Sequence, residues 1–404
     1  MIKQAIKIVT SLFCGMLIGT GIVFLVVMAM TGKSPETIAN ILAKADIADI
    51  AVSCTMSMAA FIITTMLQIV IHESGHLVGG LLTGYRFVSF RICNIALIRH
   101  DGSFALRRYS VAGTGGQCLM TPPDTTPEAM PYAVYNAGGI VANIVVATAA
   151  TAALLLYNEI PLFAFHLLIF TAITGVFFAT LNGIPMKMNG VTNDGYNIMM
   201  FRHNVANRKL FANQLRINGM IQDGTRPKDI PKELFEIPSP TDYSEAMHAS
   251  AVIMAASRKL DTGDMTDAHA MLCEAENHRN EMIGLLVKET ECELIFTSLV
   301  IGDIAEARRL YTDELKKYIT AYRNTMSSKQ RILCAIAILM DGDETKARRI
   351  YDEMEAGRGK YMMQGEVKMD LALTHALIDG NTGMAATNEK TGIGNECVHT
   401  LTLN

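Results

Sequence analysis

The chain has 404 residues, half of them hydrophobic, and a formal net charge of -4 at pH 7. This length suits two or three domains, and the mean hydropathy of +0.25 predicts a membrane domain joined to a more polar one. The small net charge argues against a nucleic-acid-binding surface. The eight cysteines form no Cys-x-x-Cys pair, which excludes a disulfide framework and a cysteine zinc site and suits a reducing compartment for the second half.

The first apolar interval lies between Lys7 and Lys33, where no residue is charged. It is long enough to cross a bilayer at about 1.5 Å per residue, so we predict a transmembrane helix over about residues 8–32. A cleaved signal peptide is the alternative, but its apolar core would span only about 7–15 residues.

The second predicted span covers residues 50–83 and contains the sequence His-Glu-Ser-Gly-His at positions 72–76. Two histidines four positions apart lie on one face of an α-helix, so both can bind one zinc ion. Glu73 would then stand beside the open coordination position, where it can accept a proton from water. Ionisable residues inside a membrane span are costly and indicate a functional site. The alternative is a buried histidine pair beside an unrelated glutamate.

The region 86–118 after the motif has the pattern of a β-hairpin. Residues 87–99 are mostly apolar and β-branched, His100-Asp101-Gly102 supplies a turn, and 103–111 form the second strand. The hairpin is either a structural cap over the site or an edge strand that pairs with an extended substrate. The glycine- and proline-rich stretch that follows cannot be regular helix, and we expect it to lie against the membrane domain.

Two further apolar intervals predict transmembrane helices over residues 132–157 and 161–184, joined as a tight hairpin. Small residues around Gly138 in the first of them allow close helix packing. Asn143 lies in the same stretch, and it either packs with them or faces the polar site. Pro185 ends or kinks the second helix.

Positive charges orient the predicted spans, because cytoplasmic loops carry an excess of lysine and arginine. Five arginines lie between the second and third spans, and more lysines and arginines follow the fourth. The loop between the first two spans mixes lysines with acidic residues. We therefore expect a multi-pass protein of the cell membrane whose N-terminus and C-terminal domain are cytoplasmic. The histidine pair then lies in the cytosolic half of its span.

Beyond the membrane domain (1–210) we predict a proline-containing linker (211–242), a helical-repeat domain (243–380) and a polar tail (381–404). The repeat is marked by Gly-Asp pairs at the ends of apolar helices, with spacings of 39 and then 40 residues: Gly263-Asp264, Gly302-Asp303 and Gly342-Asp343. Such a period indicates an α-solenoid, loosely similar to the tetratricopeptide family, with a plain helical bundle as the alternative. A solenoid would offer a surface to a protein partner.

Two motifs of the membrane domain resemble those of the site-2 protease family of intramembrane zinc metalloproteases, over roughly residues 50–200. One is the His-Glu-x-x-His motif at 72–76 inside a membrane helix, and the other is an Asn-x-x-Pro…Asp-Gly element at Asn182, Pro185, Asp194 and Gly195. The resemblance implies that the zinc ligands are His72, His76 and Asp194, that the catalytic base is Glu73, and that Asn182 orients the substrate or polarises its carbonyl.

This chain departs from the family pattern between the proline and the aspartate. Nine positions separate Pro185 from Asp194, more than is usual in the family, and Lys187 stands where a second proline often occurs. The direction of the spans favours Asp194 as a ligand, since the second and fourth spans both run toward the cytoplasm. The alternative is that Asn-Asp-Gly is only a turn, which would leave His203 or Asp124 as the third ligand.

The fold class expected from these patterns is mainly α, with about four transmembrane helices, a small β-hairpin insertion and a cytosolic α-solenoid. The expected function is a zinc metalloendopeptidase that cleaves transmembrane or membrane-bound peptides near the cytosolic face of the lipid bilayer. The alternative is a catalytically inactive membrane scaffold that recruits partners through its helical repeats. No nucleic acid is expected as a partner.

Overall fold

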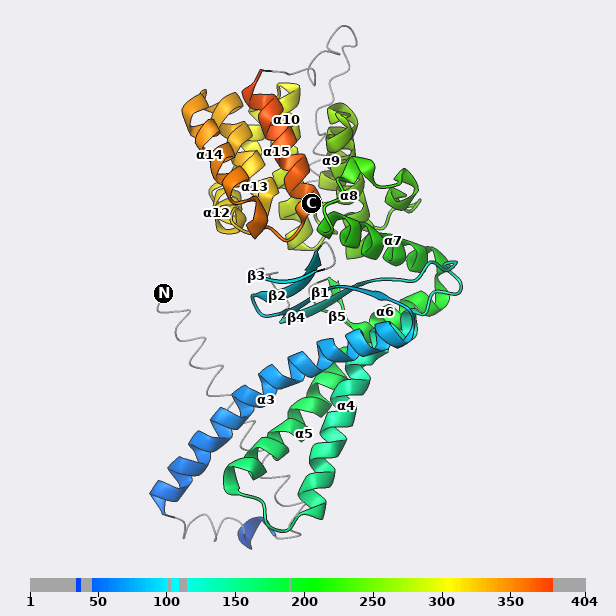
Figure 1. The fold of residues 1–404 in the computed structure, drawn as a ribbon, viewed down its shortest axis with the longest axis vertical. Helices are drawn as coiled ribbons and strands as arrows, with labels where there is room; N and C mark the ends of the chain where they lie inside the picture. Colours follow the sequence, from blue (N-terminus) through cyan, green and yellow to red (C-terminus); the bar gives the residue numbers. More distant parts are fainter. Residues whose placement is uncertain (1–33, 38–45, 101–102, 109–114, 189, 381–404) are drawn as a thin grey trace, which may run out of the picture.

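A computed structural model describes residues 34–37, 46–100, 103–108, 115–188 and 190–380. This part of the chain is mainly helical and contains a small antiparallel sheet. Figure 1 shows long helices at one end, the sheet in the middle and a group of shorter helices at the other end. The predicted span over residues 8–32 and the predicted tail over 381–404 lie outside the described residues.

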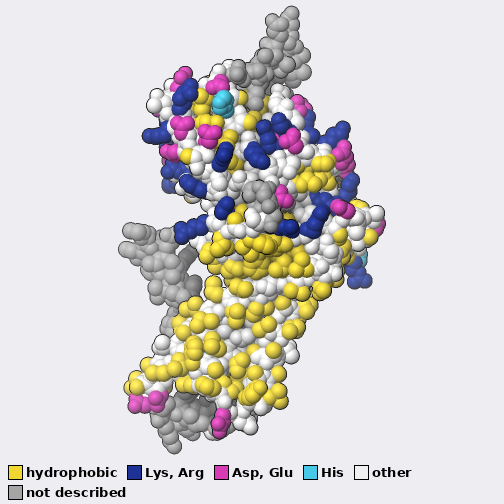
Figure 2. All heavy atoms as spheres, in the orientation of Figure 1, with side chains coloured by type: hydrophobic (Ala, Val, Ile, Leu, Met, Phe, Trp, Pro, Cys, Tyr) yellow, Lys and Arg dark blue, Asp and Glu magenta, His cyan; other side chains and the backbone are white. Residues whose placement is uncertain are grey.

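Three described helices are long and apolar enough to cross a membrane: α3 (Ile47–Leu82), α4 (Tyr132–Leu156) and α5 (Leu162–Gly183). They occupy the positions of the second, third and fourth predicted spans. Figure 2 shows an almost uncharged, hydrophobic surface over these helices. The exposed apolar side chains include Phe61, Ile62, Ile63, Val141, Val145, Val176 and Phe177. The composition expected of membrane helices is therefore present, while their orientation stays a prediction.

The predicted close packing around Gly138 is confirmed. Gly138 of α4 lies against Gly75 of α3, and a Cβ atom added to either glycine would come within 2.2 Å of the other's carbonyl oxygen. No side chain fits between two backbones at that distance, so only glycine permits this contact. The contact brings α4 against the face of α3 that carries the two histidines.

Four strands form the sheet in the order β3-β2-β1-β4, all antiparallel: β1 (Arg86–Ile92), β2 (Ile95–His100), β3 (Ser103–Arg108) and β4 (Gly116–Thr121). The pair β2–β3 is the predicted hairpin, with Ile95 opposite Arg108 and His100 opposite Ser103.

The prediction of one continuous strand over residues 87–99 is wrong. A tight turn at Cys93-Asn94 divides this stretch into β1 and β2, and Cys93 adopts a positive φ of 51°. The turn contains neither glycine nor proline, and Asn94, a residue type that favours turns, is the one polar residue that marks it. The fourth strand, β4, was not predicted, because the stretch that contains it was expected only not to be regular helix. As expected for that stretch, β4 lies against the apolar helix α3.

The chain leaves α5 at Gly183, as Pro185 predicts, and forms a two-stranded hairpin before the next helix. Its strands are β5 (Lys187–Met188) and β6 (Val191–Thr192), and α6 (Asp194–His203) follows directly.

Helix α7 (Val205–Gln222) then lies along the sheet on the side away from the membrane helices (Figure 1). Gln222 of α7 donates a hydrogen bond to the Val88 carbonyl of β1, at 2.9 Å. The stretch predicted as a linker, 211–242, begins inside α7 and continues through the short 3-10 helices η1 (Pro227–Asp229) and η2 (Lys232–Phe235).

The remaining elements, residues 246–378, are called the C-terminal helical region. They are α8 (Ala246–Thr262), α9 (Met265–Asn277), α10 (Gly284–Ile301), α11 (Ile304–Leu310), α12 (Asp313–Tyr322), α13 (Ser327–Ala335), the π-helical η3 (Ile336–Met340), α14 (Glu344–Ala356), η4 (Arg358–Lys360) and α15 (Gln364–Ile378).

Each of the three Gly-Asp pairs joins two of these helical elements. The glycines have positive φ values of 89°, 91° and 68°, which end the preceding helix at little cost because glycine has no Cβ: Gly263, Gly302 and Gly342. The alanine five positions after each glycine is fully buried: Ala268, Ala307 and Ala347. The three Gly-Asp corners thus share one local geometry, while the repeat and its solenoid architecture stay predictions.

Candidate metal centre

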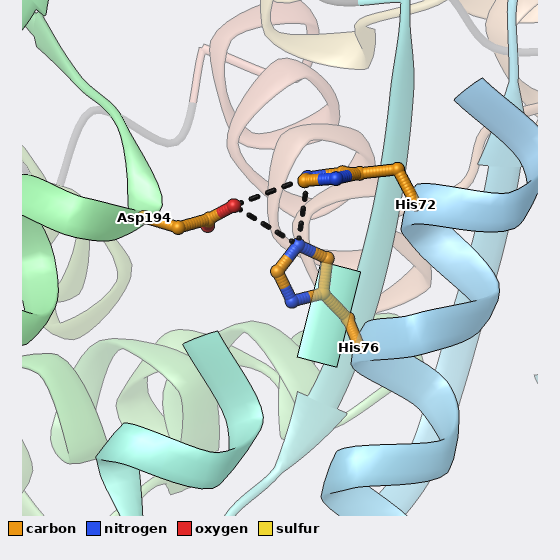
Figure 3. A group of neighbouring side chains, drawn as sticks. All are labelled: His72, His76 and Asp194. Carbon is orange, nitrogen blue, oxygen red and sulfur yellow. Dashed lines mark hydrogen bonds and ion pairs between the residues drawn. The ribbon is translucent and has the colours of Figure 1, made fainter. Parts of the chain in front are cut away.

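The two histidines of the motif lie one turn apart on α3, and their rings point toward Asp194 (Figure 3). Their Nε2 atoms are 3.1 Å apart. Asp194 Oδ2 lies 3.1 Å from Nε2 of His72 and 3.4 Å from Nε2 of His76. The structure therefore brings together the three predicted metal ligands, which come from α3 and from the first turn of α6.

Hydrogen bonds on the other side of each ring determine which nitrogen carries the proton. Nδ1 of His76 lies 2.8 Å from the Tyr135 carbonyl oxygen, which can only accept. Nδ1 of His72 lies 2.8 Å from the side-chain oxygen of Asn143. In a neutral histidine that donates from Nδ1, Nε2 has a lone pair and no hydrogen. Both Nε2 atoms are then available to bind a metal ion.

The orientation of Asn143 follows from its own donors. Its amide nitrogen donates to the backbone and side-chain oxygens of Gln68, at 3.1 and 2.6 Å, so its oxygen is left to accept from His72. Gln68 in turn donates to the Thr171 carbonyl of α5 at 3.0 Å. Of the two alternatives, packing with the small residues of α4 or facing the polar site, Asn143 faces the site. A chain of hydrogen bonds joins α3, α4 and α5 behind the metal ligands.

Gln68 is a site residue that sequence reasoning missed. It lies one helical turn before His72 and is fully buried, although it is polar and the surrounding interval is apolar. A polar residue one turn before His72 in an otherwise apolar helix could have indicated this role from the sequence, because such a side chain needs a hydrogen-bonding partner.

The three converging atoms fit a bound cation. With both Nδ1 atoms donating, two nitrogen lone pairs and a carboxylate oxygen face one another within 4.8 Å. Asp194 Oδ2 is buried and accepts no hydrogen bond from the described residues. One shared proton would satisfy only two of the three atoms, whereas a metal ion satisfies all three and removes their mutual repulsion.

Asn193, the residue before Asp194, fixes the start of α6. Its side-chain oxygen accepts from the backbone nitrogens of Tyr196 and Met186, at 2.9 and 3.1 Å. Its amide donates to two carbonyl oxygens at the end of α5, those of Leu181 and Ile184. Asn193 is therefore both the helix N-cap and the link between α5 and α6, which the sequence had left open as a simple turn.

Glu73 is buried beside the ligands and close enough to interact electrostatically with all three. Its carboxylate packs against Gly116 at the start of β4, where an added Cβ would come within 2.6 Å of the carboxylate. Arg91 holds this end of the strand by donating to the carbonyl oxygens of Gly116 and Cys93, at 3.1 and 2.7 Å. The sequence used Arg91 only as one of the loop arginines that orient the spans, and it indicated no role for this residue at the site.

Asn182 does not belong to the group of possible ligand atoms. Its amide nitrogen donates to the Phe178 carbonyl of its own helix, at 3.0 Å, so its proposed role toward a substrate stays a prediction. The alternative third ligands lie elsewhere: His203 is exposed at the end of α6, and Asp124 is exposed near Arg86 and Arg216.

Two imidazoles and one carboxylate form a typical donor set for a single metal ion with an open coordination position. The two imidazoles lie on α3, which is long and apolar enough to cross a membrane, and the carboxylate lies at the start of α6. The chain matches no family model, and no curated protein or solved structure is significantly similar to it. The candidate metal centre is therefore supported by the geometry of its residues.

Proposed function

We propose that this protein is a zinc-dependent endopeptidase that cleaves membrane-spanning or membrane-bound peptides near the cytosolic face of the bilayer. The observation that supports it is that possible ligand atoms of His72, His76 and Asp194 lie close together, beside a buried glutamate on an apolar helix. Zinc suits this set because it prefers four ligands and accepts nitrogen and carboxylate oxygen together.

A zinc ion held by these three residues would supply Lewis acidity, which makes water more acidic and polarises a peptide carbonyl. Glu73 is adjacent to the ligands without being one of them. It can therefore accept a proton from the attacking water and deliver it to the leaving amine. Its packing against Gly116 restricts where that carboxylate can move.

The sheet suggests how a substrate is presented. Strand β4 is at one edge of the sheet, and its first residue, Gly116, packs against Glu73. An extended peptide can pair with an edge strand through backbone hydrogen bonds. A peptide paired with β4 would run past the carboxylate of Glu73, so we favour the edge-strand role over a purely structural cap.

The test uses the full chain purified in detergent, with bound zinc measured by elemental analysis. Cleavage is assayed on a single-span reporter peptide in lipid vesicles. We expect wild type to bind one zinc ion and to cleave, and Glu73→Gln to keep zinc but lose cleavage by at least about 100-fold. Asp194→Ala should lose zinc and activity together, while the control Asp124→Ala should keep both.

Cleavage by Glu73→Gln, or full zinc in a well-folded Asp194→Ala variant, would contradict the assignment. Zinc binding without any cleavage by wild type would favour the inactive scaffold instead.

A further inference from the structure

The hairpin β5–β6 carries the chain from the end of α5 to Asp194. It lies between the membrane helices and the C-terminal helical region, near the sheet (Figure 1). Two separate contacts join this hairpin and the start of α6 to the helical region, and both involve residues that directly precede one of its helices.

The first contact centres on Glu245, the residue before α8. Its Oε1 atom lies 2.5 Å from Nζ of Lys187 in β5 and also accepts a hydrogen bond, at 3.1 Å, from the hydroxyl of Tyr196 in α6. The Lys187 ammonium in addition lies 5.0 Å from the centre of the Tyr196 ring. One carboxylate oxygen therefore holds residues on both sides of Asp194.

The second contact is apolar and lies at the turn of the hairpin. Gly190 has a positive φ of 81° and packs against Ile283, the residue before α10. A Cβ atom at position 190 would lie 1.9 Å from a methyl carbon of Ile283, so the two segments touch with no space left. The hairpin is thus held at its base by charge and at its tip by packing.

These contacts matter because Asp194 is the ligand that does not come from α3. The two histidines are fixed by their helix, whereas the position of Asp194 depends on how the hairpin and α6 are held. An exposed ion pair contributes little, about 0–1 kcal/mol. Glu245 is different because its side chain is only 17 % exposed and is shared by two partners. Mutating a residue that hydrogen-bonds to a metal ligand commonly lowers metal affinity by about 10–100-fold. Glu245 acts through Lys187 and Tyr196, one step further from Asp194, so its effect should lie at the lower end of this range.

We infer that Glu245 is a positioning residue for the metal centre, through which the C-terminal helical region controls how Asp194 meets the two histidines. The inference deepens the proposed function and depends on its metal site. A partner that moves the start of α8 relative to α5 would change metal affinity without touching a ligand. The C-terminal helical region is then a control element of the centre as well as a surface for partners.

The test compares zinc affinity of the full chain in detergent, measured by competition with a chromogenic chelator. We expect Glu245→Ala to weaken zinc binding by about 10-fold. The matched control is Glu236→Ala, which removes an exposed ion pair with Lys209 in the neighbouring segment and should leave affinity unchanged. Cobalt replaces zinc in a second measurement, and its visible absorption spectrum should shift in Glu245→Ala and stay as in wild type in the control.

The charge-exchanged double variant Lys187→Glu/Glu245→Lys restores an ion pair across the same contact, so it should recover most of the lost affinity. If Glu245→Ala does not fold, Tyr196→Phe takes its place, because it removes the second hydrogen bond to Glu245. Wild-type zinc affinity and an unchanged cobalt spectrum in folded Glu245→Ala, or in Tyr196→Phe, would overturn the inference. Failure of wild type itself to bind zinc would instead overturn the proposed function.

Discussion

The side-chain oxygen of Asn143 lies 2.8 Å from Nδ1 of His72, so a residue 71 positions along the chain decides which nitrogen of that histidine faces the metal site. Asn143 is fully buried, and its side-chain nitrogen donates hydrogen bonds to two oxygens of Gln68. Its contribution is therefore to orient a ligand, and this can be tested separately from catalysis.

Replacing Asn143 should weaken the metal centre while leaving the three ligands in the chain. We expect Asn143→Ala to reduce zinc affinity by about 10–100-fold, because His72 would lose the acceptor that keeps its proton on Nδ1. Chelator competition on the full chain measures this change. Thr174→Ala is the matched control, since Thr174 of α5 is also buried but donates to the Phe170 carbonyl of its own helix. Equal zinc affinity in the two variants would contradict the role given to Asn143.

A second prediction concerns Gly139, which faces the ring of His72. An added Cβ would lie 2.5 Å from a ring carbon, so Gly139→Ala must displace either the imidazole or the helix. We expect this variant to lose zinc and cleavage while it still folds. Gly183→Ala is the control, because its Cβ would meet Ile140 at 3.5 Å, an ordinary contact. Retention of zinc by Gly139→Ala would show that α4 can move away from α3 at no cost to the site.

The third prediction concerns the pH dependence of stability in the C-terminal helical region. Glu366 lines a cavity of about 320 Å³ together with Asp370 and Glu293. Burial first, and then these two neighbouring carboxylates, raise the pKa of Glu366 from 4.5 to about 8. Between these values the folded state binds more protons at this position than the unfolded chain, so stability falls as pH rises from about 5 to 8.

Glu366→Gln removes this penalty, because glutamine has no charge to bury. The unfolding temperature of the variant should exceed that of wild type by an amount that grows between pH 5 and pH 8. Glu355→Gln, at an exposed position in α14, should show no such trend. Scanning calorimetry of the full chain at several pH values measures the difference, and a constant or shrinking difference would be inconsistent with a protonated Glu366 in this cavity.

Local patterns in the sequence were enough to predict the three apolar helices and the pairing of His72 with His76 on one face. Helical hydrogen bonds join residues four apart, and apolarity is a property of each short stretch, so neither depends on the rest of the fold. The same holds for the helix end before Pro185 and for the Gly-Asp corners of the C-terminal helical region. The division of residues 87–99 into two strands was missed, because Asn94 alone, without glycine or proline, is a weak local signal for the turn.

The resemblance had implied Asp194 as the third ligand, but tertiary structure decided how it reaches the histidines and which other distant residues complete the site. Asn143 reaches His72 because glycines let α4 approach α3, and Asp194 reaches both histidines because Asn193 joins α6 to the end of α5. Glu245 reaches the hairpin only through the packing of the C-terminal helical region. Such contacts depend on the angles and distances between whole elements, which no short stretch of sequence encodes.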